Sequence, residues 1–318
     1  MIAVRYDDAA SDDQRRAGLY AGDLFLYGAT PATRAFCAFA RELIEEAFAG
    51  HDPEKAQYAI PVEQYAAILG ELKPRFIHHV RSKEFVREML AERGCDLDQT
   101  YFDVPRMRSS TSNDYLTSGI AYAWHPHRDT WFSAPVQQVN WWLPIYAMEA
   151  GNGMAFHTAY FGRATPNTSE TYNYYEWNSK HRRAATDNVK AENRPMPRPI
   201  DPIDPTKDVV FVTPVGGVQM FSGAQLHSSV PNMTGKTRFS IDFRTVHIGD
   251  IAAGRGAANV DAACTGTSIR DFLRASDFSP MPEEIVRLFD DGTQALGDEL
   301  VYQENLRSAE DARRLQAE

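Results

Sequence analysis

The middle of this 318-residue chain, from about residue 101 to 246, contains short β-rich segments broken by turn residues, with no helical pattern between them. The expected strands are 119–124, 136–146, 154–160, 209–213, 218–221 and 237–246. Parallel sheets need a crossover, usually a helix, between successive strands, so this order excludes a Rossmann-like fold. It predicts an antiparallel sandwich or jelly roll. The absence of GxGxxG, GxxxxGKS/T and GxSxG motifs agrees with that exclusion.

Helical patterns flank this β-rich tract. Thr30 and Pro31 predict an N-cap and a first turn, and apolar residues follow at helical spacing until Gly50. Further helices are expected at 62–72, 82–93, 268–275 and 282–289. We therefore expect a mainly β fold with helical flanks.

A single domain is expected over residues 1–318, because the chain shows neither an internal repeat nor a second complete core. Its expected parts are a helical N-terminal support at 1–98, a jelly-roll core at 99–250 and a C-terminal extension at 251–318. Within the core, residues 163–207 form a polar, aromatic and proline-rich insertion. Its tyrosines and tryptophan favour an ordered lid over a disordered loop.

Charge and cysteine content exclude several classes of function. The 43 acidic and 33 basic side chains give a formal net charge of -10, so no general field favours nucleic acid or an anionic membrane. The three cysteines form no CxxC pair, which excludes a disulfide scaffold and a cysteine-rich zinc or iron–sulfur site. No segment approaches the roughly 18 apolar residues of a membrane span, and the N-terminus has no secretory pattern. A cytoplasmic protein is therefore expected.

His127 and Asp129 stand two positions apart in a His-Arg-Asp triplet that follows a β-like run. On an extended strand such residues point to the same face, so both side chains can reach one metal ion. His227 ends a later β-rich segment that a glycine turn begins, and Arg238 follows eleven residues on. Two imidazoles and one carboxylate leave three adjacent coordination positions open, as expected of non-haem Fe(II) oxygenases. These three residues are the candidate metal ligands.

This order of His-x-Asp, distal His and Arg resembles the Fe(II)- and 2-oxoglutarate-dependent oxygenases, especially the phytanoyl-CoA dioxygenase-like members and, second, the taurine dioxygenase-like members. The resemblance covers about residues 120–246 and implies a double-stranded β-helix, a cupin-like jelly roll, as the core. It implies that His127, Asp129 and His227 hold Fe(II), while 2-oxoglutarate and O2 fill the open positions. Arg238 would bind the distal carboxylate of 2-oxoglutarate, which a planar guanidinium matches in bidentate fashion. Succinate and CO2 would be released.

The resemblance also places Ser229 and Ser240 where such enzymes often keep a hydroxyl near the cosubstrate. Related halogenases have a small residue in place of the carboxylate. Asp129 therefore favours hydroxylation, or desaturation or ring closure, over halogenation.

Further polar and aromatic residues are candidates for the pocket. The candidate substrate contacts are Arg244, Trp131, Tyr174 and Trp177. Asp242 and Arg244 alternate onto one strand face and are expected to form an internal ion pair. Trp141 and Trp142 are adjacent on a strand, so one is expected to face the pocket and the other the core.

Two other functions use the same residues. A zinc hydrolase could hold its metal on the three ligands, but it leaves Arg238 without a role, and no HExxH motif supplies a general base. A non-catalytic jelly-roll binding protein would use these residues structurally. The primary expectation is an enzyme that oxidises a small-molecule metabolite, with neither nucleic acid nor a membrane as partner. The residues after 265 could contribute to a homodimer contact.

Overall fold

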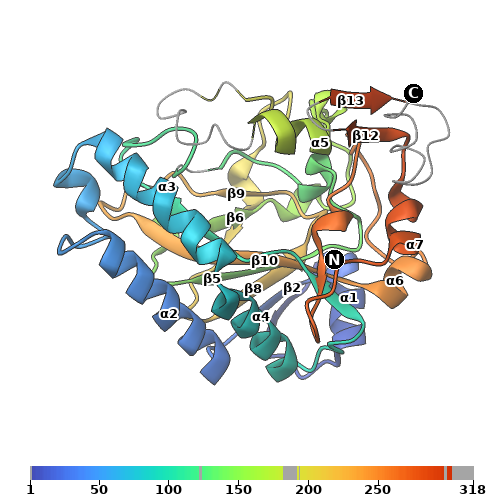
Figure 1. Ribbon diagram of the computed structural model, residues 1–318, viewed down its shortest axis with the longest axis horizontal. Helices are drawn as coiled ribbons and strands as arrows, with labels where there is room; N and C mark the ends of the chain where they lie inside the picture. Colours follow the sequence, from blue (N-terminus) through green and yellow to red (C-terminus); the bar gives the residue numbers. More distant parts are fainter. Residues whose placement is uncertain (1, 122–123, 182–191, 193, 297–298, 303–318) are drawn as a thin grey trace.

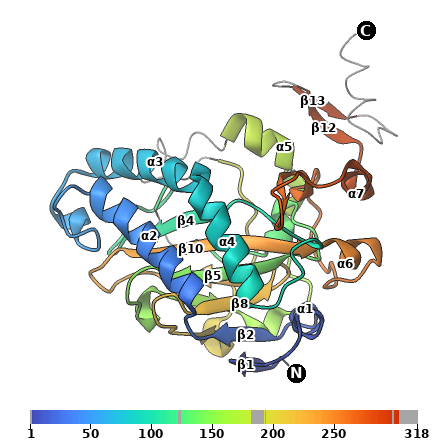
Figure 2. The ribbon, with the colours of Figure 1, turned by 60° about the horizontal axis from the view of Figure 1, so that its bottom comes forward.

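The computed structural model describes residues 2–121, 124–181, 192, 194–296 and 299–302. Its three long helices are α2 (Pro31–Ala47), α3 (Val62–His78) and α4 (Val80–Glu92). They lie together over one face of the largest sheet (Figure 2). Their apolar sides share one core with that face of the sheet, where Phe36 and Leu69 from the helices join Trp141 and Phe243 from the strands. This core anchors the sheet that carries the site.

Helix α2 begins where the sequence predicts. Thr30 accepts a hydrogen bond from the backbone N–H of Thr33, the hydroxyl of Thr33 accepts one from the N–H of Thr30, and Pro31 occupies the first turn. The expected helices at 62–72 and 82–93 correspond to α3 and α4. Helix α1 (Asp12–Tyr20), which starts at a Ser11 capping box, has no counterpart among the expected helices.

The largest sheet has eight strands. Their order is β1 (Val4–Tyr6), β2 (Leu24–Tyr27), β8 (Val218–Ser222), β5 (Val139–Pro144), β10 (Arg238–His247), β3 (Thr100–Phe102) and β11 (Leu273–Arg274), and β4 (Arg106–Ser110) pairs with the first half of β10. Strands β1 and β2 belong to the first thirty residues, so the segment 1–98 is not the purely helical support expected. The apolar residues of β2 pair with β8, Phe25 lying opposite Met220, and this pairing extends the sheet.

A second sheet has three strands, β7 (Val209–Val210), β6 (Met154–Phe156) and β9 (His227–Ser229). The chain passes back and forth between the sheets, with β5, β8 and β10 in the large sheet and β6, β7 and β9 in the small one. An apolar cluster that includes Trp142, Phe156 and Phe221 joins their facing sides. Apart from the parallel pair β1 and β2, the strand pairings of the described residues are antiparallel. The fold is thus sheet-rich, with helices on the outer face.

The remaining elements are short. They are α5 (Tyr174–Glu176), the π-helix η6 (Trp177–His181), α6 (Ile248–Ala252), α7 (Glu283–Val286), and the hairpin β12 (Thr293–Leu296) and β13 (Glu299–Tyr302), which lies beside α5 in Figure 1. Single 3-10 turns occur at Ala56–Tyr58, Asp129–Phe132, Ala150–Asn152, Thr158–Tyr160, Ser169–Thr171, Pro205–Lys207, Ile269–Asp271 and Arg287–Phe289. The first part of the expected lid at 163–207 is therefore ordered as short helices, whereas residues 182–191 and 193 lie outside the described residues.

Several expected elements differ from the structure. The strand expected at 154–160 ends at Phe156 and a 3-10 turn follows at Thr158–Tyr160, and the strand expected at 209–213 ends at Val210. The segment 119–124 contains no strand among its described residues, since Gly119 lies in a turn with φ of 71°. The helix expected at 268–275 is limited to the 3-10 turn Ile269–Asp271, because Leu273 then pairs with Phe102 of β3 at the edge of the large sheet, where the backbone is extended. Within the described ranges, no helix is both long and apolar enough to cross a bilayer.

Candidate functional site

His127, Asp129 and His227 converge in the structure. Each is buried, and one possible ligand atom from each lies within 4.8 Å of the others. The backbone of His127 exchanges two hydrogen bonds of 2.9 Å with that of His227, an isolated antiparallel bridge at the end of the small sheet. Asp129 begins a 3-10 turn rather than continuing a strand, and its N–H donates to the carbonyl of Gly223 at 2.9 Å. The extended backbone of Arg128 still keeps both side chains on one side.

The two histidines are held in the same tautomer by matching contacts. The Nδ1 of His127 lies 2.9 Å from the carbonyl oxygen of His125, and the Nδ1 of His227 lies 2.9 Å from that of Gln225. A ring nitrogen facing a carbonyl oxygen must carry the proton, so Nε2 of each ring keeps its lone pair for a metal. Burial lowers the pKa of His227 to about 3, which keeps this imidazole neutral. His125, two residues before His127, has its Nε2 2.8 Å from the carbonyl oxygen of Pro197.

The carboxylate of Asp129 is oriented by two amides that the sequence did not single out. Its Oδ2 accepts hydrogen bonds from Gln138 at 2.8 Å and from Asn140 at 2.7 Å, while its Oδ1 lies 3.6 Å from Nε2 of His127. Burial by itself would raise the pKa of Asp129, but the contact with His127 and the charge of Arg244 outweigh it and hold the pKa well below its usual range. Oδ1 is therefore an ionised ligand atom facing the histidines. Amide side chains at the start of the buried strand β5, Gln138 just before it and Asn140 within it, are the sequence signal that could have revealed this support.

Arg238 is a buried cation on which the charge of Asp242 acts without forming an ion pair. Its Nη1 donates to the carbonyls of Asn152 at 3.0 Å and Gly153 at 3.1 Å, and its Nε is buried without a hydrogen-bond partner. Among the described residues, none forms an ion pair with it. Burial lowers the pKa of Arg238 to about 10. A buried charge left uncompensated is costly, so this guanidinium calls for an anionic ligand.

The position of Arg238 relative to the metal ligands follows from strand register. Phe156 of β6 lies opposite His227, and Gly153, whose carbonyl Arg238 binds, is three residues earlier. Three residues of extended chain span about 10 Å. Arg238 therefore binds the small sheet three positions along the strand from the residue that pairs with His227.

Trp142 is the tryptophan on the inner side of the sheet. It belongs to the cluster between the two sheets, and the Arg238 guanidinium lies 5.5 Å from its ring centre. Trp141 points to the helices, stacks on Phe243 and donates to the hydroxyl of Thr245 at 2.9 Å. Strand alternation thus assigns Trp142 to the site and Trp141 to the core.

Ser240 and Ser229 occupy different environments. Ser240 follows Arg238 by two residues on β10, is fully buried, and has a hydroxyl without a partner. It therefore offers a free hydrogen-bonding group on the inner face. Ser229 lies on β9 opposite Met154 and is half-buried.

Arg244 is committed to ion pairs. It bonds Asp103 at 3.0 Å, and lies 3.6 Å from Asp242 and 3.8 Å from Asp129. The expected pair of Asp242 and Arg244 is present, although Arg108 is the nearer partner of Asp242 at 2.6 Å. The interpretation of Arg244 as a direct substrate contact needs correction, because three carboxylates already surround it. It orients Asp129 instead.

The aromatic candidates also divide. Trp131 is fully buried and donates its indole N–H to Asp261 at 2.8 Å, so its side chain offers no surface to a substrate, contrary to expectation. Tyr174 donates its hydroxyl to Asp271 of the C-terminal extension. Trp177 is half-buried and lies 5.9 Å from the ring of Tyr172. Tyr174 and Trp177 are both half-buried, whereas Trp131 is fully buried.

Arg128, between two of the ligands, anchors three distant segments. Its Nε donates to Asp261 at 3.1 Å, and its Nη2 donates to the carbonyls of Tyr160 and Arg163 at 2.8 Å. Asp261 also accepts from Trp131 and from the N–H of Thr165 at 3.0 Å. This ion pair therefore ties the start of the insertion and the C-terminal extension to the ligand-bearing turn.

Changing Asp261 to Asn should lower stability and loosen the site. Asn keeps the size but removes the charge opposite Arg128, which is 1% exposed, and breaking a buried pair costs about 3 kcal/mol or more. Urea unfolding should show this loss, and Co(II) titration should show weaker metal binding. Asp98 is exposed, and its change to Asn is the matched control. An unchanged unfolding midpoint in the Asp261 variant would contradict the role of this pair.

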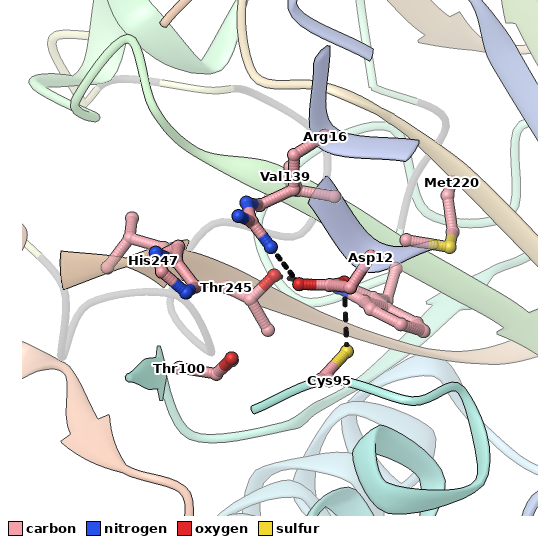
Figure 3. A pocket seen from close by; sticks show the side chains of 10 residues that line it. Asp12, Arg16, Cys95, Thr100, Val139, Met220, Thr245 and His247 are labelled. Atoms are coloured by element: carbon pink, nitrogen blue, oxygen red, sulfur yellow. Dashed lines mark hydrogen bonds and ion pairs between the residues drawn. The ribbon is translucent and has the colours of Figure 1, made fainter. Parts of the chain in front are cut away.

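A separate small cavity lies on the helix-facing side of the large sheet (Figure 3). Asp12 forms an ion pair there with Arg16 and accepts a hydrogen bond from the thiol of Cys95 at 3.3 Å. Thr100 Oγ1 and His247 Nδ1 line it without hydrogen-bond partners. Its free space suits about one water molecule, so it is no substrate site.

No family model matches the chain, and no curated protein matches it at a significant level. Solved structures similar to it include EvdO2 from Micromonospora carbonacea var. aurantiaca complexed with 2-oxoglutarate (12% identity, 76% of this chain and 93% of that chain, TM-score 0.41). Another is the non-haem α-ketoglutarate-dependent epimerase SnoN from nogalamycin biosynthesis (12% identity, 74% of this chain and 80% of that chain, TM-score 0.37). A third is the non-haem monooxygenase ThoJ (14% identity, 69% of this chain and 71% of that chain, TM-score 0.37). At these values the functional conclusion rests on the geometry of the site.

Proposed function

We propose that this protein is an Fe(II)- and 2-oxoglutarate-dependent dioxygenase that hydroxylates, desaturates or cyclises a small metabolite and releases succinate and CO2. The observation that carries the proposal is the buried, anion-free guanidinium of Arg238 near a buried group of two histidines and one carboxylate. A three-ligand metal site alone suits several functions. A buried guanidinium in addition to that site suits a dicarboxylate, which can bind the metal at one end and Arg238 at the other.

The residues fit both groups. His127 and His227 offer Nε2 and Asp129 offers Oδ1, a set that suits Fe(II) and leaves three positions open. The unpartnered Nε of Arg238 and hydroxyl of Ser240 suit a carboxylate, which accepts several hydrogen bonds. When bound, Fe(II) with 2-oxoglutarate and O2 supplies the oxidant that removes hydrogen from the substrate.

The protein's own residues position these groups and exclude water. Gln138 and Asn140 fix the carboxylate of Asp129, so that Oδ1 points to the histidines. Arg238 would orient the cosubstrate through its distal carboxylate. Trp142 covers the guanidinium, and the low polarity there strengthens the charge-assisted contact.

We also propose that the core is a double-stranded β-helix. The inner strands of the large sheet follow the order β8, β5, β10 and β4, and they face β7, β6 and β9, with the His127 bridge beside β9. Antiparallel strands that alternate between two facing sheets support this architecture. The ligands then lie where the small sheet meets the chain crossing from the large one.

Anaerobic titration tests the proposal. Addition of Fe(II) and then 2-oxoglutarate to the metal-stripped protein should produce the visible charge-transfer band of a chelated keto acid, and the band should decay when O2 is admitted. Succinate should accumulate as it decays. If Fe(II) binds and no band forms, the zinc-hydrolase interpretation becomes the better one, although that interpretation leaves the free guanidinium of Arg238 unexplained.

A further inference from the structure

Two of the three metal ligands and four neighbouring side chains form a closed ring, in which each side chain contacts the next. The members are Asp129, Arg244, Asp242, Arg108, Trp124 and His127. Because His127 and Asp129 belong to this ring, its other members lie beside the proposed metal position. Their chemistry therefore bears on which ligand can bind next to the metal.

One half of the ring is polar. Arg244 lies 3.8 Å from Asp129 and 3.6 Å from Asp242, and Arg108 binds Asp242 through Nε at 2.6 Å and Nη2 at 3.2 Å. Nη1 of Arg108 has no acceptor among the residues that the structure describes. This arginine therefore keeps hydrogen-bond donors that Asp242 does not occupy, and these donors can bind a further anion.

The other half of the ring is aromatic. The guanidinium of Arg108 lies 5.7 Å from the ring centre of Trp124, whose ring is 5.3 Å from that of His127. Phe132 packs edge-on against His127 at 5.5 Å and against Tyr172 at 5.2 Å. Both Trp124 and Phe132 keep partly exposed rings, which provide an apolar wall beside the metal ligands.

Two more cations border the ring. Lys73 reaches from α3, where its ammonium donates to the carbonyl of Ile120 and feels the charges of Arg108 and Asp242. Burial, together with the charge of Arg108, lowers its pKa to about 7, as expected of a lysine without its own counter-ion. Arg106 is bonded to Asp103.

Charge around the ring is unbalanced. Once Asp129 is assigned to the metal, the carboxylates of Asp103 and Asp242 are the ion-pair partners that the described residues offer to Arg106, Arg108 and Arg244. Lys73 adds a further positive charge when it is protonated. The cosubstrate does not correct this difference, because its distal carboxylate is assigned to Arg238. A partly buried excess of positive charge favours an anionic ligand.

We propose that the primary substrate is a small organic acid, whose anionic group binds Arg108 and Lys73 and whose apolar part lies against Trp124 and Phe132. This inference rests on the proposed function, because it assigns the substrate side of the same metal site. It places the carbon to be oxidised between the acid group and the aromatic wall.

Calorimetry on the anaerobic Fe(II)–2-oxoglutarate complex tests the substrate class with two probes of equal shape, 3-phenylpropionate and its neutral amide. The acid should bind at least about tenfold more tightly than the amide, since a charge-assisted hydrogen bond contributes roughly 1.5–3 kcal/mol. The charge-transfer band should persist throughout, which shows that the acid has not displaced 2-oxoglutarate.

Two variants assign the effect to residues. Changing Lys73 to Met or Arg108 to Gln should each remove most of the preference for the acid and leave amide binding unchanged. Lys73→Met preserves every ion pair, so it keeps the test valid if Arg108→Gln fails to fold. Arg75→Gln, at an exposed arginine of the same helix, is the control and should keep the preference.

The possible failures are distinguishable. Absence of the band in the wild-type protein overturns the proposed function itself. A normal band with equal or no binding of the two probes, or with an acid preference that both variants retain, overturns the proposed substrate class alone. Bleaching of the band by the acid has the same meaning, because the acid would then occupy the cosubstrate site.

Discussion

Changing Asp129 to Ala should abolish succinate formation and weaken metal binding at least about 100-fold, since loss of residues that merely support a ligand already costs roughly 10–100-fold. Asp129 is the one carboxylate of the group, and its ionised Oδ1 faces both histidines. Without it, two neutral imidazoles remain. The measurements are Co(II) or Fe(II) affinity by titration and succinate formation with O2.

Asp208 offers a matched control for this variant. It is also bonded to a histidine, His157, at 2.7 Å, in the neighbourhood of the small sheet but outside the ligand group. Asp208→Ala should therefore keep metal binding and turnover. Full succinate formation by the Asp129 variant would remove the proposed ligand set.

Changing Arg238 to Gln should raise the concentration of 2-oxoglutarate needed for half-saturation about 100-fold, because truncating one partner of a buried charge pair costs about 2–5 kcal/mol. Metal affinity should stay within about threefold, since Arg238 makes no contact with the three ligands. The charge-transfer band, titrated with 2-oxoglutarate at constant Fe(II), measures both quantities.

The free energy of unfolding of the Arg238→Gln variant distinguishes a role in 2-oxoglutarate binding from a structural role. Because burial lowers the pKa of Arg238 below its unfolded value of 12.5, folding works against its charge at every pH below about 10. Removing the charge should therefore not reduce the unfolding free energy of the protein without cosubstrate. A less stable variant with unchanged 2-oxoglutarate affinity would make Arg238 a structural residue, and Arg238→Lys should recover part of the affinity by restoring the charge.

The sequence predicted which residues come together at the site better than what supports them. Spacing and the β-like run before the triplet paired His127 with Asp129, and the order of motifs added His227 and Arg238, because these residues follow recognisable β-rich runs and a glycine turn. Asp261 could not be found this way. Its role depends on a contact with Arg128 that is 133 residues distant in the chain.

The errors have the same origin. Trp131 follows the ligand-bearing triplet directly, so the sequence suggests proximity to a substrate, but the 3-10 turn directs its ring into the interior. Residues 268–275 have a helical pattern, yet pairing of Leu273 with β3 decides their conformation. Local patterns fixed most of α2, α3, α4 and the inner strands, whereas edge strands depend on partners elsewhere.

The backbone bridge between His127 and His227 bears on how the protein acquires its metal. Two chain segments a hundred residues apart exchange hydrogen bonds through their main chains, and the tautomers are set by further carbonyls, none of which requires an ion. We therefore expect the site to be assembled before loading, so that a metal can leave and return without unfolding. Such a ready-made site would not select iron by its fold, because intrinsic affinity favours nickel, copper and zinc over Fe(II). We then expect the metal that the protein carries to follow the supply of metals around it.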